Sequence, residues 1–283
     1  MKLILSRKGF DSAAGGCPSP ILGDGSMLSL PIPDRTSPIR YQDMTLHGHD
    51  LGAVAADLTK GRVRPDFGAH LDPDLAASAY PRAPGWRPLF GQAGSEQTVL
   101  ARERVGAGDL FFFFGWFRRV QRSGGQWRFV PGAPDLHVIW GWFQIDEVVP
   151  VTSLSPDPWM RYHPHVAAAD HRINNTLYVS RETLAIDSTE TDVPGAGAFR
   201  TYDDRLRLTK PGRSRSHWSL PAWFAPTPPR PPLGYHRDPK RWQHAGDQVE
   251  LASVGRGQEF VLDTDWYPEA RPWIHDLLQH SES

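Results

Sequence analysis

Gly-Asp-Leu-Phe-Phe-Phe-Phe-Gly-Trp-Phe (residues 108–117) and His-Val-Ile-Trp-Gly-Trp-Phe-Gln-Ile (residues 137–145) are the stretches that decide the fold of this chain. Each is an apolar run of strand length with a glycine before Trp-Phe, and a polar, turn-rich segment joins them. Such runs predict two neighbouring buried strands. They also put tryptophans beside glycines, where a flat ligand can approach the backbone closely. The sequence therefore indicates a binding site more clearly than a reaction.

Composition and charge narrow the class of protein. The 283 residues are 39% hydrophobic and 22% charged, which is typical of a soluble globular protein with a sizeable core. The formal net charge of −1 gives no global field for a polyanion, so any nucleic-acid contact has to come from a local patch. The single cysteine, Cys17, excludes an internal disulfide and fits a reducing cytoplasm. No segment approaches the roughly twenty apolar residues of a membrane span, so we expect a cytoplasmic protein.

The pattern around the two aromatic runs predicts short strands and a few helices. Strands are expected at 3–5, 126–130, 175–180 and 259–262, and helices at 50–60, 95–104 and 272–280. Strands that follow one another without regular helices between them favour an antiparallel arrangement. We expect an α+β fold: a curved, mainly antiparallel sheet or small barrel, with peripheral helices and long irregular loops.

Several motifs resemble one bacterial and phage family, nucleotide modification associated domain 3. They lie at 5–12 (Leu-Ser-Arg-Lys-Gly-Phe-Asp-Ser), 18–21, 70–75, 90–92, 108–117, 163–165, 175–179, 216–221 and 257–261. The resemblance spans nearly the whole chain and favours one domain over residues 1–283. Within it we expect a strand-rich core at about 105–180 and a basic, Pro-rich segment at about 205–241. The family implies association with systems that modify DNA bases or nucleotides, and it brings no catalytic constellation.

A first functional hypothesis is recognition of a nucleobase. A helix followed by 105–111 and 139–145 resembles the small barrels of the PUA, ASCH and EVE type, which hold an unstacked or modified base in an aromatic pocket. Stacking a base on an aromatic side chain contributes about 1–3 kcal/mol. Alternatively, the tryptophans belong to the core and the basic residues to a solvated face. The residues expected to contact base or phosphate are Trp116, Trp140, Trp142, Arg7, Asn175, Arg213, Arg215 and Trp218.

A second hypothesis is a metal-dependent enzyme in the same systems, with a divalent metal as cofactor. His163 and His165 share one side if the chain is extended there, and the proline between them fixes the local backbone. His70 and Asp72, near Asp74, repeat the spacing. With 12 histidines, however, such a pair is expected about once by chance. Asp72 also has a structural interpretation as the cap of a helix that starts with Pro73.

A third hypothesis places catalysis in the first loop, residues 6–16. Lys8, Asp11 and Ser12 combine a cation, a carboxylate and a hydroxyl beside flexible glycines, but no residue there orients a base against a nucleophile. Cys17 is expected to be a small buried residue. The favoured interpretation is a protein that recognises or processes a nucleobase, with nucleic acid or a nucleotide and other proteins of a modification system as partners. A non-catalytic interaction protein stays open as an alternative.

Overall fold

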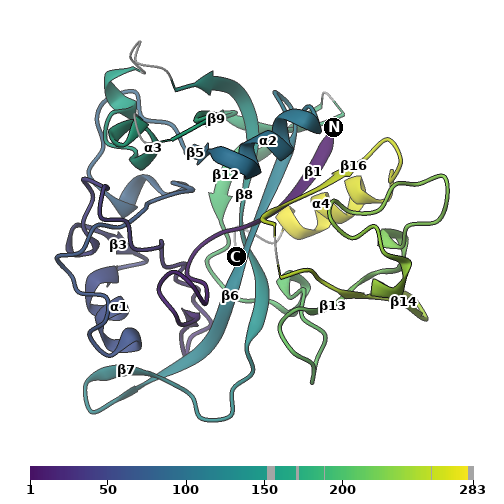
Figure 1. Ribbon diagram of the computed structural model, residues 1–283. Helices are drawn as coiled ribbons and strands as arrows, with labels where there is room; N and C mark the ends of the chain where they lie inside the picture. The colour runs from purple at the N-terminus through teal and green to yellow at the C-terminus, as the bar shows by residue number, and fades with distance from the viewer. Residues whose placement is uncertain (152–156, 170–171, 188, 256, 280–283) are drawn as a thin grey trace.

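The computed structural model describes residues 1–151, 157–169, 172–187, 189–255 and 257–279 (Figure 1). Within them, helices lie around one large mixed sheet and several small sheets. The fold is therefore mixed α+β, as predicted, and the strands of this part of the chain close no barrel. The α-helices are α1 (Leu51–Thr59), α2 (Gly94–Arg102), α3 (Pro164–Ala167) and α4 (Ala270–Gln279).

The large sheet is built around the two aromatic runs. β1 (Lys2–Arg7) and β2 (Ser19–Ile21) run parallel to β6 (Leu110–Ser123), and the other pairs that the described residues form in this sheet are antiparallel. β2 (Ser19–Ile21) and β7 (Gln126–Phe129) also pair with β6, and β12 (Ala196–Ala198) pairs with β8. The main path is β16 (Glu259–Asp263), β1 (Lys2–Arg7), β6 (Leu110–Ser123), β8 (Leu136–Pro150), β9 (Thr176–Ser180) and β5 (Leu89–Gln92).

The predicted pairing of the two runs is confirmed. Leu110 lies opposite Gln144 and Phe117 opposite Leu136, in antiparallel register. The register shifts where the partners change from Gly141 to Ile139, so Trp140 is the extra residue of a bulge. Bulges re-aim side chains. The core forms where the phenylalanines of β6 meet those of the neighbouring strands.

Smaller elements surround this sheet. Two-stranded sheets are formed by β3 (Thr45–Leu46) with β4 (His49–Asp50) and by β10 (Thr183–Ile186) with β11 (Thr189–Pro194). A three-stranded sheet has the order β13 (His217–Pro221), β15 (Gln248–Ala252), β14 (Trp242–Ala245). Short 3-10 helices cover Tyr41–Asp43, Ala77–Ala79, Pro158–Met160, Asp204–Leu206, Ala222–Phe224 and Pro239–Arg241.

The prediction of helices is right at three places and wrong at one. The helices expected at 50–60, 95–104 and 272–280 are α1, α2 and α4, and Asp50 caps α1 by accepting the Ala53 N–H at 3.0 Å. No helix begins at Asp72. The backbone of Asp74 instead exchanges hydrogen bonds of 2.8 and 3.1 Å with Leu89, which holds this segment against β5. The carboxylate of Asp72 is thereby free to act elsewhere.

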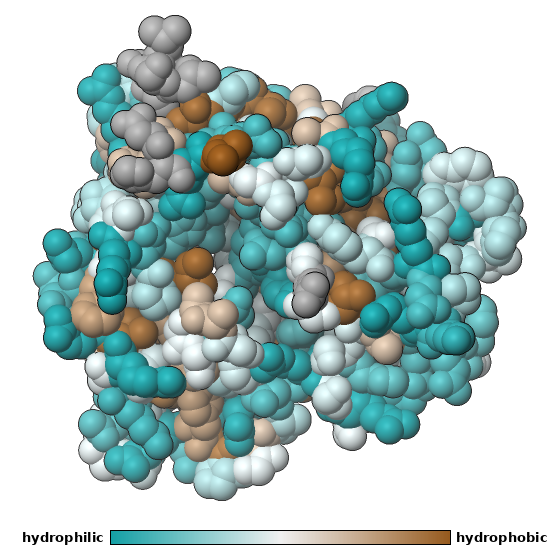
Figure 2. Space-filling view, viewed as in Figure 1, coloured by the Kyte–Doolittle hydropathy of each residue, from teal (hydrophilic) through white to brown (hydrophobic). Residues whose placement is uncertain are grey.

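The visible surface of the molecule is mostly hydrophilic. Figure 2 shows its hydrophobic residues scattered among hydrophilic ones. The large exposed hydrophobic side chains of the described residues are Val148, Ile173, Tyr235 and Trp266. None of the helices described is both long and apolar enough to cross a membrane.

Candidate metal centre

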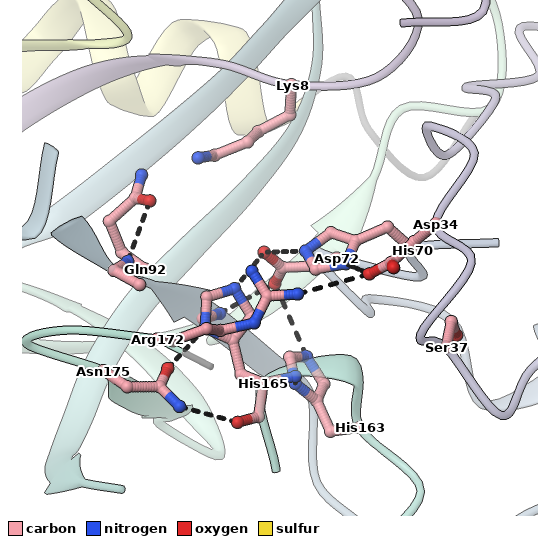
Figure 3. Close-up of polar contacts among 12 residues, drawn as sticks. Lys8, Asp34, Ser37, His70, Asp72, Gln92, His163, His165, Arg172 and Asn175 are labelled. Carbon is pink, nitrogen blue, oxygen red and sulfur yellow. Dashed lines mark hydrogen bonds and ion pairs between the residues drawn. The ribbon is translucent and has the colours of Figure 1, made fainter. Parts of the chain in front are cut away.

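Asp72 lies at the centre of a buried group of histidines (Figure 3). Its Oδ2 is 3.7 Å from His70 Nε2 and 3.6 Å from His165 Nε2, and its Oδ1 is 3.5 Å from His163 Nε2. One ligand atom each from His70, Asp72 and His165 lies within 4.8 Å of the other two. The three side chains are thus close enough to share one metal ion. We call His70, Asp72 and His165 the metal triad.

The neighbouring strand β5 shapes the floor of the metal triad. The Gly91 N–H donates to Asp72 Oδ1 at 2.7 Å, which fixes one carboxylate oxygen. A side chain at position 91 would clash with the ring of His165, so only glycine lets this ring lie against β5. His165 itself is placed by α3, whose first residue is the proline that the sequence puts between the two histidines.

Hydrogen bonds on the far side of each ring fix which nitrogen of the two triad histidines faces Asp72. His70 Nδ1 is 2.8 Å from Asp34 Oδ2, and His165 Nδ1 is 2.6 Å from Asn175 Oδ1. The Asn175 amide is oriented by its own Nδ2, which donates to the His165 carbonyl at 2.7 Å. Both Nδ1 atoms therefore carry the proton, and both Nε2 lone pairs point to Asp72. Metal-binding histidines are typically held in this way.

His163 has a different part in the cluster. Its Nδ1 accepts the backbone N–H of His165 at 3.3 Å, which puts the proton on Nε2. This Nε2 faces Asp72 Oδ1, the oxygen that Gly91 also holds. Burial lowers the pKa of His163 to about 4, so the ring is neutral near pH 7. His163 thus steadies the carboxylate and leaves Oδ2 to the metal triad.

The charges of the cluster favour an ionised carboxylate. Burial opposes ionisation of Asp72, but its contacts with the three histidines outweigh burial and hold the pKa of Asp72 well below its usual range. Burial also lowers the pKa of His70, while its hydrogen bond to Asp34 and its contact with the Asp72 carboxylate raise it, and the net result is a raised pKa. The hydrogen bond from His70 is the main cause that lowers the pKa of Asp34. Asp34 also accepts from Arg172 at 3.2 Å.

The donor atoms of the metal triad fit a divalent transition metal. Imidazole nitrogens suit zinc, iron, copper and nickel, and two histidines with one carboxylate are the usual ligands of non-haem iron(II). Three protein ligands leave coordination positions for water and substrate. The triad can therefore hold a metal that takes part in a reaction, in contrast to a closed structural site.

Lys8 lies beside the metal triad but has its own partner. Its Nζ is 3.1 Å from Glu259 Oε1 and 4.7 Å from the centre of the Phe90 ring. Glu259 Oε1 also accepts from Gln92 Nε2 at 2.6 Å and from Ser6 Oγ at 3.0 Å. Figure 3 shows Lys8 and Gln92 next to the cluster. Lys8 is thus part of a buried ion pair.

The other predicted catalytic residues have structural partners. Asp11 Oδ1 accepts the N–H groups of residues 13 and 14 at 2.7 and 2.6 Å and so shapes the first loop. Ser12 Oγ accepts from Arg215 at 2.8 Å. Asp74 binds both terminal nitrogens of Arg82 at 2.6 Å. Cys17 is buried, and burial raises its pKa to about 11, which leaves a thiol and no reactive thiolate near pH 7.

The three tryptophans of the predicted aromatic pocket lie in different surroundings. Trp140 lines a narrow cavity of about 50 Å³, together with Phe199 and Asp72. Trp142 is buried, and its Nε1 donates to the Pro194 carbonyl at 2.8 Å. Trp116 is half-buried, and the Arg215 guanidinium lies 3.9 Å from the centre of its ring. The ring face that was expected to stack on a base thus carries a cation.

The remaining predicted binding residues are spread over the fold. Arg7 donates to the carbonyls of residues 254, 255 and 257 at 2.8 to 3.2 Å. Trp218 is fully buried, with its Nε1 donating to His137 Nδ1 at 3.0 Å. Arg213 is exposed. Asn175, predicted to contact a base, is a hydrogen-bond partner of His165.

Sequence reasoning missed Asp34, Arg172, Gln92 and Glu259. Asp34 lies 36 residues before His70 in the chain, and no local pattern links the two. The sequence signals that pointed to a metal site were the His-x-Asp spacing of residues 70 and 72 and the His-x-His spacing of residues 163 and 165.

Comparison with known proteins identifies one family. The family model described as nucleotide modification associated domain 3 matches residues 2–263, a span that contains the whole metal triad. No curated protein matches the chain, and no solved structure does.

Proposed function

Since the chain belongs to the nucleotide modification associated domain 3 family, we propose that it is a metal-dependent enzyme acting on a nucleotide or on a base of nucleic acid. His70, Asp72 and His165 are its metal ligands. The observation that carries this proposal is the convergence of their ligand atoms within 4.8 Å. The family's association with nucleotide modification supports the substrate class.

The metal and the residues around the metal triad have different proposed roles. A bound divalent metal supplies Lewis-acid polarisation of an oxygen or lowers the pKa of a bound water. Asp34 and Asn175 keep the two imidazoles turned toward the metal, since each accepts the Nδ1 proton of its histidine. Burial of the cluster limits competing water, because the Asp72 side chain is only 4% exposed.

The proposed base contact is Trp140. It lines the same cavity as Asp72, so a base held there lies beside the triad. The cavity of about 50 Å³ is smaller than the roughly 300–1,000 Å³ of ligand pockets, so a base enters only after the walls move apart. The protein is proposed to act in a bacterial or phage DNA modification system in the cytoplasm, with the other proteins of that system as its partners. The aromatic pockets of PUA-type barrels serve as an analogy for how this protein would hold a base.

Metal binding by the untagged protein tests the proposal. The chain is stripped with a chelator and titrated with iron(II), manganese(II) and zinc(II), and bound metal is measured by calorimetry and elemental analysis. We expect one ion per chain in the wild type and none in Asp72→Asn or His165→Ala. The control is His244→Ala, at an exposed position of β14, which should bind like the wild type. A folded wild-type protein that takes up none of the three metals would overturn the proposal.

A further inference from the structure

A second cavity, of about 600 Å³, adjoins the metal centre through Asp34. Its walls are residues 12, 13, 15 and 16 of the first loop, the segment 33–35, Arg40, and the two stretches 62–63 and 66–68. This volume lies within the range of small-molecule sites. The same Asp34 whose Oδ2 holds His70 is one of its lining residues. We call it the arginine pocket.

The arginine pocket has an excess of positive charge. Arg35, Arg40 and Arg62 line it, and within the described residues none of them forms an ion pair with a carboxylate. Its two acidic residues are already neutralised. Asp34 is shared by His70 and Arg172, and Asp66 accepts from both Arg64 Nε and Arg64 Nη2, at 3.0 and 3.1 Å.

Within the described residues, Arg35, Arg40 and Arg62 use few of their guanidinium N–H groups in hydrogen bonds, so most of these donors can bind a ligand. Arg40 Nη1 donates to the Asp66 carbonyl at 2.6 Å, and Arg62 Nε donates to the Thr59 carbonyl at 3.2 Å. A guanidinium has five N–H donors in a fork that matches phosphate oxygens. The remaining donors of Arg40 and Arg62, with those of Arg35, suit a phosphate group better than a neutral ligand.

The first loop brings backbone close to these side chains. Gly15 and Gly16 adopt φ of 85° and 70°, in the left-handed region that glycine favours. A Cβ on Gly16 would be 3.3 Å from a guanidinium nitrogen of Arg62, so glycine allows Arg62 to lie against the loop. Asp11 holds the turn by accepting the N–H groups of residues 13 and 14. The wall facing the arginines is thus fixed before a ligand arrives.

We propose that the arginine pocket binds the phosphate of the substrate, so that the attached nucleoside is presented to the metal triad across Asp34. This inference rests on the proposed function and names its substrate class: a phosphate ester of a nucleoside. The phosphate belongs either to a free nucleotide or to a nucleic-acid strand, since the arginines recognise the same oxygens in both.

Binding measured by calorimetry at low salt tests this pocket. The probes are a nucleoside, its 5′-monophosphate and a short single-stranded oligonucleotide. We expect the two phosphate-bearing probes, or one of them, to bind at least tenfold more tightly than the nucleoside. The Arg35→Ala/Arg62→Ala variant should lose about tenfold or more of that affinity. Arg128→Ala, an exposed position on β7 outside the pocket, is the matched control and should bind like the wild type.

The two phosphate-bearing probes separate the sources of the phosphate. Tighter binding of the monophosphate points to free nucleotides, and tighter binding of the oligonucleotide, with a steep loss in salt, points to a strand. The pocket proposal fails if the double variant binds both as tightly as the wild type, or if phosphate adds no affinity. Metal content is measured in every variant. Lost phosphate affinity with unchanged metal supports the pocket, whereas a protein that binds phosphate but no metal contradicts the proposed function alone.

Discussion

Asp34 Oδ2 lies 2.8 Å from His70 Nδ1, and this contact decides which nitrogen of His70 is offered to a metal. The same oxygen also accepts a hydrogen bond from Arg172 Nη2 at 3.2 Å, which helps to hold the carboxylate in place. The orientation of a proposed metal ligand therefore depends on Asp34, which lies outside the metal triad and lines the arginine pocket.

Replacing Asp34 should weaken metal binding. Asp34→Ala removes the acceptor of the His70 proton, and loss of such a partner typically costs about 10–100-fold in metal affinity. The measurement is a competition titration with a metal-sensitive dye, without nucleotide. Asp66→Ala, which removes a carboxylate from the same pocket without touching a histidine, should bind metal as the wild type does. Equal affinity in both variants would show that His70 does not need Asp34.

Stability should fall in mild acid because of His137. Burial lowers the pKa of His137 to about 3, whereas the unfolded side chain titrates near 6.5. Below pH 6.5 the unfolded chain binds a proton that the folded chain excludes, so stability is lost as the pH falls toward 3. This one group should cost about 2 kcal/mol of unfolding free energy at pH 5 relative to pH 7.

Urea unfolding at the two pH values measures this loss. His137→Asn keeps an acceptor near Trp218 Nε1 and has no proton to gain. The variant should therefore lose less stability than the wild type between pH 7 and pH 5. The same pH dependence in both proteins would assign the acid sensitivity to other groups.

The Lys8–Glu259 ion pair should be sensitive to the loss of one partner. Glu259 is fully buried, and its Oε2 has no hydrogen-bond partner among the described residues. Lys8→Met leaves a buried carboxylate without its cation, which typically costs about 3–5 kcal/mol of stability. In urea unfolding, the double variant Lys8→Met/Glu259→Gln should be more stable than Lys8→Met. If the single change left stability unaltered, the pair would have no structural role.

Replacing Trp142 should destabilise the fold more than replacing Trp116. Trp142 is buried against Phe199, with ring centres 4.9 Å apart, so Trp142→Ala should destabilise the fold by about 3–5 kcal/mol. Trp116 is half-buried under Arg215, and Trp116→Ala should cost clearly less. Thermal unfolding of the two variants side by side makes the comparison. Equal losses would mean that Trp116 is as much a core residue as Trp142.

The parts of the fold that could be predicted from the sequence are those set by apolar runs and by contacts between residues close in the chain. The paired strands β6 and β8 were predictable because long apolar runs need a buried partner. The capping role of Asp50 was predictable because the N–H that its carboxylate accepts lies only three residues away, at Ala53. The same reasoning was wrong at Asp72, since the pairing of Asp74 with Leu89, distant in sequence, outweighs a local helix preference.

The candidate site was predictable only in part. The spacing of His163 and His165 drew attention to a metal, yet α3 turns the two rings to different oxygens of Asp72. Asp34 and Asn175 hold the triad through contacts that only the assembled fold creates. Such contacts leave no periodicity in a single sequence.

The position of β1 in the sheet has a consequence for how the chain folds. Leu3 pairs with Leu110 on one side and with Leu262 on the other. β1 therefore has both its edges covered only after β16, far along the chain, has been made. Pairings so distant in sequence slow folding and leave an open strand edge in the meantime. Because Lys8 follows β1 directly and Glu259 begins β16, their ion pair can form only after β16 has been made, so the open edge of β1 and the uncompensated charge of Lys8 persist together until then.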